Sequence, residues 1–259
     1  MSFQNSTKGS QALPKLKQGL DRSNAEVRPK ALLVGSGTFN PVHKLHLRRF
    51  YLARHFLEEH VGMKVVGGIV SPSHPTLVRQ RYRVKAAEII PPKHRLAMAR
   101  AAVGNNSWLT VDPWEITRRR IMDYMSVLEH VRDVLHDTFP GLLANITILY
   151  LCPASQVLKL NPTLLRVGGF GIITVCRPLE RERLIQQLSP PFARIVHVVE
   201  DLAILSAELE KTSSTAVRAC LKEGKLVDGM VGRAVAHYIK DHRLADKISG
   251  KQRWSNEVR

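Results

Sequence analysis

His43 and His46 are the pair in this 259-residue chain whose type and spacing point most directly to chemistry. They stand three residues apart where a helical apolar pattern begins, so a helix would place both imidazoles on one face. Imidazole N–H groups donate hydrogen bonds to phosphate oxygens, and the unpaired amides at a helix N-terminus attract the same anions. Gly35, Gly37 and Pro41 come just before the pair. This order predicts a strand, a glycine-containing turn and a helix that together bind a phosphorylated ligand.

A second stretch with similar chemistry runs from Lys211 to Arg218. The hydroxyls of Ser213, Ser214 and Thr215 directly precede an apolar helical pattern, which is a strong signal for a helix N-cap. Many helices begin with such residues and bind nothing. With a guanidinium one turn inside the helix, however, the same arrangement can form a cradle for a polyphosphate.

Apolar runs alternate with amphipathic stretches along the chain, and this alternation indicates the elements that must position these residues. We expect an α/β fold with a doubly wound parallel sheet of about six strands, whose carboxyl ends hold the ligand. The expected strands lie within residues 31–34, 64–70, 108–115, 145–152, 168–178 and 194–199. Helices are expected from about residue 42, over 94–103 and 118–138, and within 221–244, and a basic loop over 73–92.

The organisation predicted from composition is one domain over residues 31–245. Residues 1–30 are polar and basic with little periodicity, so we expect a flexible tail there, and residues 246–259 are expected to form a second loose tail.

The net charge of +17 predicts polyanionic partners, although charge alone does not choose among nucleotides, nucleic acid and an acidic membrane. The longest apolar runs, such as residues 146–152, are too short to span a bilayer, and we expect no membrane partner. The three cysteines are far apart and lack C-x-x-C spacing, which favours a reducing compartment. We expect the cytoplasm, with nucleus and mitochondrion left open. A homo-oligomer is also left open.

Three segments together resemble the nicotinamide/nicotinate mononucleotide adenylyltransferases of the nucleotidylyltransferase superfamily. Gly37-Thr-Phe-Asn-Pro-Val-His-Lys-Leu-His46 resembles the superfamily signature G-x-F-x-P-x-(H/T)-x-x-H. Residues 108–115 resemble the segment W-V-x-V-D-x-W-E, and residues 212–218 resemble I-S-S-T-x-x-R with Thr212 in place of isoleucine. The resemblance covers roughly residues 32–244 and keeps the motifs in the family's order.

This resemblance implies a Rossmann-like nucleotidyltransferase fold and adenylyl transfer from ATP to nicotinamide mononucleotide, and also to the nicotinate form. His43, His46 and Arg218 would be catalytic. The residues that would hold ATP and its phosphates are Gly35, Ser36, Gly37, Phe39, Lys85, Arg177, Ser213, Ser214 and Thr215. The mononucleotide would contact Trp108, Asp112, Trp114 and Ser155. Mg²⁺ is expected to arrive with ATP, and no metal site on the protein is expected.

The chain departs from the family pattern at further positions. Leu45 replaces the glycine of H-x-G-H, Ser155 replaces the aspartate of Gly-x-Asp, and Ile121 stands where eukaryotic members carry a second aromatic residue. Two alternatives therefore stay open. One is a sister nucleotidylyltransferase with another phosphate acceptor, which residues 108–115 argue against. The other is a degenerate, non-catalytic binder of nucleotides or nucleic acid; a basic face interleaved with aromatic residues is missing, which argues against nucleic acid.

Overall fold

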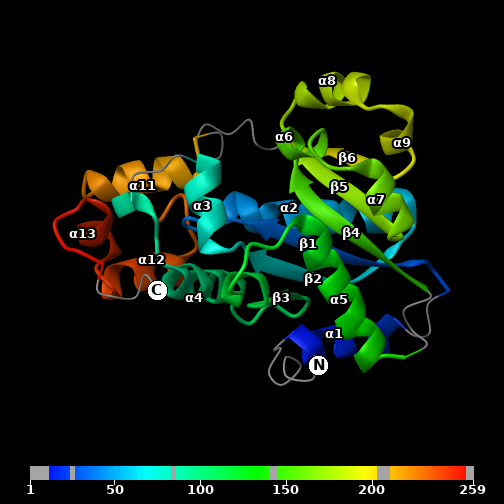
Figure 1. Ribbon diagram of the computed structural model, residues 1–259, viewed down its shortest axis with the longest axis horizontal. Helices are drawn as coiled ribbons and strands as arrows, with labels where there is room; N and C mark the ends of the chain where they lie inside the picture. Colours follow the sequence, from blue (N-terminus) through cyan, green and yellow to red (C-terminus); the bar gives the residue numbers. More distant parts are fainter. Residues whose placement is uncertain (1–11, 24–26, 83–85, 141–144, 203–210, 255–259) are drawn as a thin grey trace.

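A computed structural model of the chain describes residues 12–23, 27–82, 86–140, 145–202 and 211–254. Within these residues a sheet of parallel strands in the order β3-β2-β1-β4-β5-β6 forms the centre of the molecule (Figure 1). The predicted fold class, a doubly wound parallel sheet, is confirmed. The strands are β1 (Lys30–Gly37), β2 (Lys64–Pro72), β3 (Leu109–Val111), β4 (Ile146–Pro153), β5 (Phe170–Cys176) and β6 (Val196–Glu200).

Helices precede, connect and follow the strands, with short single-turn elements between some of them. The first half of the chain contains α1 (Ala12–Ser23), α2 (Lys44–Phe56), η1 (Leu57–Val61), α3 (Pro75–Tyr82), η2 (Ala86–Glu88), α4 (Pro92–Val103), η3 (Glu115–Thr117) and α5 (Tyr124–Thr138). The second half contains α6 (Ala154–Val157), α7 (Pro162–Val167), α8 (Glu180–Gln187), α9 (Pro190–Ala193), α11 (Ser214–Lys222), α12 (Arg233–Asp241) and α13 (Leu244–Ile248).

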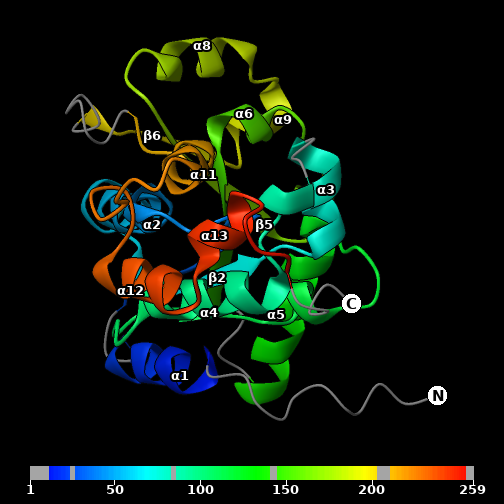
Figure 2. The same ribbon diagram turned by 90° about the vertical axis from the view of Figure 1, so that its left-hand side faces the viewer.

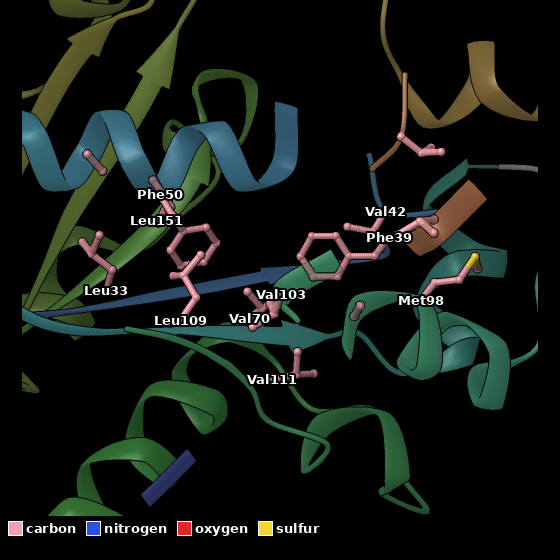
Figure 3. Close-up of a cluster of buried hydrophobic side chains, with 14 of the residues drawn as sticks. Leu33, Phe39, Val42, Phe50, Val70, Met98, Val103, Leu109, Val111 and Leu151 are labelled. Atoms are coloured by element: carbon pink, nitrogen blue, oxygen red, sulfur yellow. The ribbon is translucent and has the colours of Figure 1, made fainter. Parts of the chain in front are cut away.

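The two faces of the sheet bury different sets of helices, because successive side chains of a strand point to opposite faces. Leu33 of β1 belongs to the apolar cluster formed with α2, α4 and the C-terminal helices, whereas Leu32 belongs to the cluster formed with α1 and α5. Figure 3 shows Phe50 of α2 pointing onto the sheet beside Leu109. The strands are apolar on both faces, as parallel strands covered by helices on each side must be.

Strand β1 pairs with β2 on one side and with β4 on the other. The chain therefore winds outward in opposite directions from these central strands, which leaves a crevice at their carboxyl ends. Residues 38–43 lie at this edge, between β1 and the start of α2.

The C-terminal helices α11, α12 and α13 lie together at one end of the molecule, beside α4 (Figure 2). Ile248 of α13 is 1% exposed, and the indole Nε1 of Trp254 donates to the carbonyl of Ala87 at 3.1 Å. The prediction of a loose tail from residue 246 is therefore wrong as far as residue 254. The apolar periodicity of the sequence did not predict this segment, because only a short helix and a single tryptophan hold it in place.

Helix α1 contradicts the prediction that residues 1–30 form a flexible tail. Leu16 and Leu20 are each 2% exposed against β2, and the ammonium of Lys15 donates to the carbonyl of Leu109 at 3.0 Å. Gly67 makes room for this packing, since a Cβ there would lie 2.4 Å from Leu16 Cδ2. The prediction over residues 1–11 and 24–26 lies outside the described residues.

Two other predicted boundaries differ from the structure. The basic loop expected over residues 73–92 contains α3 and η2. The helix expected over 118–138 begins only at Tyr124, because the Asp123 carboxylate caps it by accepting the Ser126 amide at 2.8 Å. The helix therefore does not include residues 118–122, among which are Arg118, Arg119 and Arg120.

We expect Gly19→Ala to weaken the docking of α1. A Cβ at Gly19 would lie 1.9 Å from the Val66 carbonyl oxygen, which is backbone and cannot rotate away. The free energy of unfolding should fall by about 1–3 kcal/mol, as for other overpacked sites, measured by urea denaturation. The matched control is Gln18→Ala at the neighbouring exposed position, where alanine favours the helix. Equal stability of the two variants would contradict the packing described for α1.

Candidate active site

The loop between β1 and α2 is held in shape by Asn40. Its amide Nδ2 donates to the Glu88 carbonyl at 3.0 Å, and its Oδ1 accepts the Ile90 amide at 2.9 Å. The bond between Asn40 and Pro41 is cis, and Phe39 has a φ of 42°, a left-handed conformation that a bulky residue rarely adopts. A strained residue such as Phe39 persists where its surroundings hold it, often at a functional site.

His43 and His46 are stacked, with ring centroids 3.6 Å apart and planes at 29°. The backbone amide of His43 donates to His46 Nδ1 at 3.1 Å. Because a neutral imidazole carries one N–H, the proton of His46 must lie on Nε2. Burial, then the charge of Arg49, lowers the pKa of His43 to about 3. Burial, then His43 and Arg49, holds the pKa of His46 well below 6.5. At neutral pH the pair is uncharged, and His46 presents a fixed N–H donor.

A cavity of about 420 Å³ opens beside the histidine pair at the carboxyl edge of the sheet. It brings together residues that are distant in sequence, and its polar lining includes His43, His46, Arg49, Ser155, Arg177, Arg183, Asp201, Thr212 and Ser213. A volume of this size is typical of a site for a small molecule. The structure thus brings together His43 and His46, predicted to be catalytic, with Arg177 and Ser213, predicted to hold ATP and its phosphates. Ser155, predicted to contact the mononucleotide, lines the same cavity.

A smaller cavity of about 80 Å³ shares His46 and Arg49 with the larger one. Its lining includes four further residues predicted for the nucleotide crevice: Gly35, Ser36, Gly37 and Phe39. Gly35 also has a packing role, since a Cβ there would lie 2.7 Å from Phe50 Cζ.

Arg49 is a candidate binding residue that the sequence interpretation missed. It lines both cavities and stands one helical turn after His46, so spacing on α2 could have indicated it. Arg183 of α8 was also missed, because nothing in the sequence indicated that α8 covers this edge. Together with Arg177 these guanidinium groups favour a polyanionic ligand in the larger cavity.

The start of α11 is fixed against the β1–α2 loop. Ser213 is the N-cap, with its hydroxyl accepting the Ala216 amide at 3.1 Å, and the Ser214 hydroxyl donates to the Pro41 carbonyl at 2.8 Å. A second helix N-terminus therefore lies next to the histidine pair. The predicted N-cap is confirmed.

Arg218, predicted as a phosphate ligand, lies within an internal network and does not line either cavity. It is 6% exposed and donates to the Asn40 carbonyl at 2.8 Å, to Glu88 Oε2 at 3.3 Å and to the Thr215 hydroxyl at 3.4 Å. Glu88 also pairs with Lys222, whose hydrogen bond, followed by that of Arg218, lowers the pKa of Glu88. In this structure Arg218 holds α11 to the loop, and Thr215 belongs to the same network.

Trp114 lies just after β3, in the segment 112–115 that follows the carboxyl end of this strand. Its amide donates to Asp112 Oδ1 at 3.0 Å, and its indole stacks on His130 of α5 with centroids 4.2 Å apart and planes at 8°. His130 Nε2 lies 3.4 Å from Asp112 Oδ2. Asp112 and Trp114 therefore occupy the carboxyl edge, as predicted for the mononucleotide side.

Buried Glu115 ties this exit to β1 and β2. Its Oε2 accepts the hydroxyls of Ser36 at 2.7 Å and Ser71 at 3.0 Å, and burial raises its pKa. The side chain of Ser36 therefore points to Glu115 while the residue lines the smaller cavity.

Trp108 is a correction to the predicted site. It precedes β3, so it lies at the amino end of that strand, whereas ligands bind at carboxyl ends. Its ring packs against α2, 5.5 Å from the Tyr51 ring centroid and 4.9 Å from Arg54 Cζ. The motif indicated the segment correctly but could not tell which of its two tryptophans lies at the carboxyl end of β3.

Lys85 lies outside the described residues, so its assignment stays a prediction. Within the described ranges, no group of three or more His, Cys, Asp or Glu residues could hold a metal ion. A search of the same residues finds no helix long and apolar enough to cross a bilayer.

Burial of His43 in its neutral form predicts a loss of stability in mild acid. The folded-state pKa of about 3 lies below the ordinary 6.5, so below pH 6.5 the unfolded chain takes up a proton that the folded chain does not. This stabilisation is complete above pH 6.5 and is lost progressively as the pH falls toward 3. When the pH falls from about 7.5 to about 5, the free energy of unfolding should decrease for both proteins. The decrease should be about 2 kcal/mol smaller for His43→Asn than for the native chain.

Urea denaturation at the two pH values measures this difference. The control is His136→Asn, whose histidine side chain is 72% exposed, and which should keep the native pH dependence. If His43→Asn also kept it, burial of a neutral His43 would not be the source of the acid sensitivity.

Comparisons with known proteins agree with this arrangement. A family model described as cytidylyltransferase-like matches residues 34–219. Nicotinamide/nicotinic acid mononucleotide adenylyltransferase 2 of Rattus norvegicus is 35% identical over 122 residues, which are 47% of this chain and 38% of that protein. The chain thus spans well under half the length of this relative. The corresponding adenylyltransferase of Oryza sativa subsp. japonica is 27% identical over 234 residues, covering 86% of this chain and 89% of that one.

A solved structure of Plasmodium falciparum nicotinic acid mononucleotide adenylyltransferase, complexed with NaAD, superimposes with a TM-score of 0.58. The two sequences are 13% identical, and the match covers 84% of this chain and 98% of that chain. At this level of identity the likeness supports the fold alone.

Proposed function

Since the chain belongs to the cytidylyltransferase-like family, we propose that it transfers an adenylyl group from ATP to nicotinate or nicotinamide mononucleotide. The products would be the corresponding dinucleotide and pyrophosphate. The observation that carries this proposal is the fixed N–H donor of His46, which lies beside a second helix N-terminus at the crevice between β1 and β4. The names of the rat and rice relatives support the choice of acceptor.

The reaction asks for positioning and charge stabilisation rather than covalent catalysis. A 5′-phosphate oxygen of the mononucleotide attacks the α-phosphorus of ATP, and the bond to the β-phosphate oxygen breaks on the opposite side. His46 Nε2 donates to the oxygen on which negative charge builds in the transition state. Ser213 and the amides at the start of α11 hold the β- and γ-phosphates that leave as pyrophosphate.

Arginines and the indole complete the proposed site. Arg49, Arg177 and Arg183 would neutralise the triphosphate, since all three line the larger cavity. Trp114 would stack on the pyridine ring of the mononucleotide, because it lies at the carboxyl end of β3 and a flat ring suits a flat heterocycle.

Mg²⁺ would enter the site bound to the triphosphate of ATP. It would neutralise the phosphates when bound. The cytoplasmic location and the oligomeric state stay predictions.

The experiment that tests the proposal is pyrophosphate release by purified protein. Mg²⁺-ATP and Mg²⁺-CTP are each compared with nicotinate mononucleotide, nicotinamide mononucleotide or no acceptor. Acceptor-dependent release with ATP and formation of the dinucleotide would support the proposal. Release with CTP alone would show that ATP is not the donor and would overturn the proposal. Nucleotide binding without release would support the non-catalytic binder.

A further inference from the structure

A cavity of about 380 Å³ that the proposed function does not use opens between α2, α4 and the start of α12. Val42 and Val235 are each 1% exposed in its wall. Leu47 and Ala102, which are half-buried, extend the same apolar lining. His43 also lines this cavity, and it is the one described residue that the cavity shares with the larger cavity of the candidate active site. A concave, largely apolar space of this volume is typical of a binding site for a small molecule.

The charged side chains of this cavity are both positive. They are Lys44 and Arg48, and no carboxylate is among the described residues that line the cavity. The ammonium of Lys44 donates to the Asp228 carbonyl at 3.0 Å, and an ammonium has three N–H groups, so two are left for a ligand. Arg48 is largely neutralised, because its Nε and Nη2 each donate to the Asp201 carboxylate at 2.7 Å. Lys44 is therefore the main source of charge for an occupant.

The start of α12 adds a second group that favours an anion. Gly232 lines the cavity and is the N-cap of α12, where it provides no side chain to accept the first amides of the helix. A Cβ at Gly232 would meet no atom within 4 Å, so the space beside this helix start is open. Lys44 lies close by, since its backbone amide donates to the Met230 carbonyl at 2.9 Å. The helix start and the ammonium thus favour the same kind of ligand group.

We propose that this cavity binds a small molecule with an apolar body and one carboxylate group. The apolar body packs against Val42, Leu47 and Val235, and its burial supplies affinity. The carboxylate lies between the Lys44 ammonium and the start of α12, where charge-assisted hydrogen bonds fix its orientation. The site is separate from the one proposed for adenylyl transfer and does not depend on it. Because His43 lines both cavities, the occupant also touches the histidine pair.

Binding of phenylbutyrate, with phenylbutanamide as its uncharged counterpart, tests the proposal by isothermal titration calorimetry. The two probes have nearly the same shape and differ by one negative charge. We expect the native protein to bind the acid with a Kd about tenfold lower than that of the amide, because only the acid forms charge-assisted hydrogen bonds. Neither probe is a nucleotide, so the measurement does not require turnover.

Gly232→Asp places a carboxylate of the protein where the carboxylate of the ligand is proposed to lie. Its backbone, with φ of −70° and ψ of 152°, accepts aspartate, which is a preferred N-cap. Repulsion between like charges should then raise the Kd of phenylbutyrate about tenfold or more. The matched control is Gly229→Asp, which adds the same charge at an exposed glycine with equal room for a Cβ. Its Kd should stay within about threefold of native, because solvent screens an exposed charge.

Ala102→Leu tests the apolar part of the cavity independently, because a larger side chain on α4 fills the space and should weaken binding of both probes. Absence of saturable binding by the acid would overturn the proposal, and so would equal affinity for acid and amide. Equal weakening by the two aspartate variants would assign the effect to net charge and overturn it too. If Gly232→Asp does not fold, Ala102→Leu decides: weaker binding supports this cavity, and unchanged binding refutes it.

Discussion

Replacement of His46 by alanine is expected to lower kcat by about a hundredfold to a thousandfold, the cost of removing one preorganised donor to a transition-state oxyanion. The physical reason is the fixed proton on Nε2, set by the amide of His43. The imidazole is neutral in the free protein because burial holds its pKa low, so what it contributes is a directed N–H group. Steady-state pyrophosphate release at saturating ATP and acceptor measures the effect.

Two further variants test whether His46 acts as a hydrogen-bond donor or through another property of its side chain. His46→Gln retains an N–H group and should recover part of the lost turnover. His55→Ala, on an exposed position of the same helix, should leave kcat unchanged. Thermal unfolding of all three variants checks that the fold is intact. If His46→Ala kept kcat within a few-fold of native, the assignment of His46 to the transition state would be wrong.

Arg218→Met is expected to lower both turnover and stability, because the guanidinium joins α11 to the β1–α2 loop. Its loss removes the bonds to the Asn40 carbonyl and to Glu88, and a buried pair that loses one partner costs about 3–5 kcal/mol. Lys222 still pairs with Glu88, so we expect the lower end of that range. Turnover should fall by about tenfold or more as the start of α11 moves.

A double-mutant cycle distinguishes this positioning role from direct phosphate binding. If Arg218 acts through Glu88, then Arg218→Met and Glu88→Gln should be strongly non-additive in the free energy of unfolding and in kcat. Lys222→Met, which leaves the bond between Arg218 and Glu88 in place, is the control. If turnover fell strongly while stability stayed unchanged and the two substitutions were additive, Arg218 would instead be assigned to direct phosphate binding.

The central part of the fold could be predicted because its signals are local. The apolar runs of β1, β4 and β5 are long enough to indicate buried parallel strands, and glycine, proline and the helical spacing after Pro41 mark where the chain turns. The Ser213 cap was readable for the same reason. The secondary structure of each of these segments depends on residues that are close to it in the sequence.

The errors concern partners that are distant in sequence. Helix α1 resembles a basic tail in composition, and its burial depends on Gly67 far along the chain. Arg218 resembles a phosphate ligand until Glu88, 130 positions away, is seen beside it. Trp108 and Trp114 belong to one motif, and only the direction of β3 shows that they lie at opposite ends of the strand. A one-dimensional pattern does not contain this information.

The docking of α1 has a consequence for synthesis of the chain on the ribosome. Lys15 and its acceptor Leu109 are 94 positions apart, so α1 lacks the last of its partner strands, β3, for about 5–20 s at usual elongation rates. Until β2 has emerged, Leu16 and Leu20 form an exposed apolar patch on a nascent segment, which chaperones can bind. Once β3 has emerged, β1 to β3 and α1 can assemble as one half of the sheet before the strands of the other half exist.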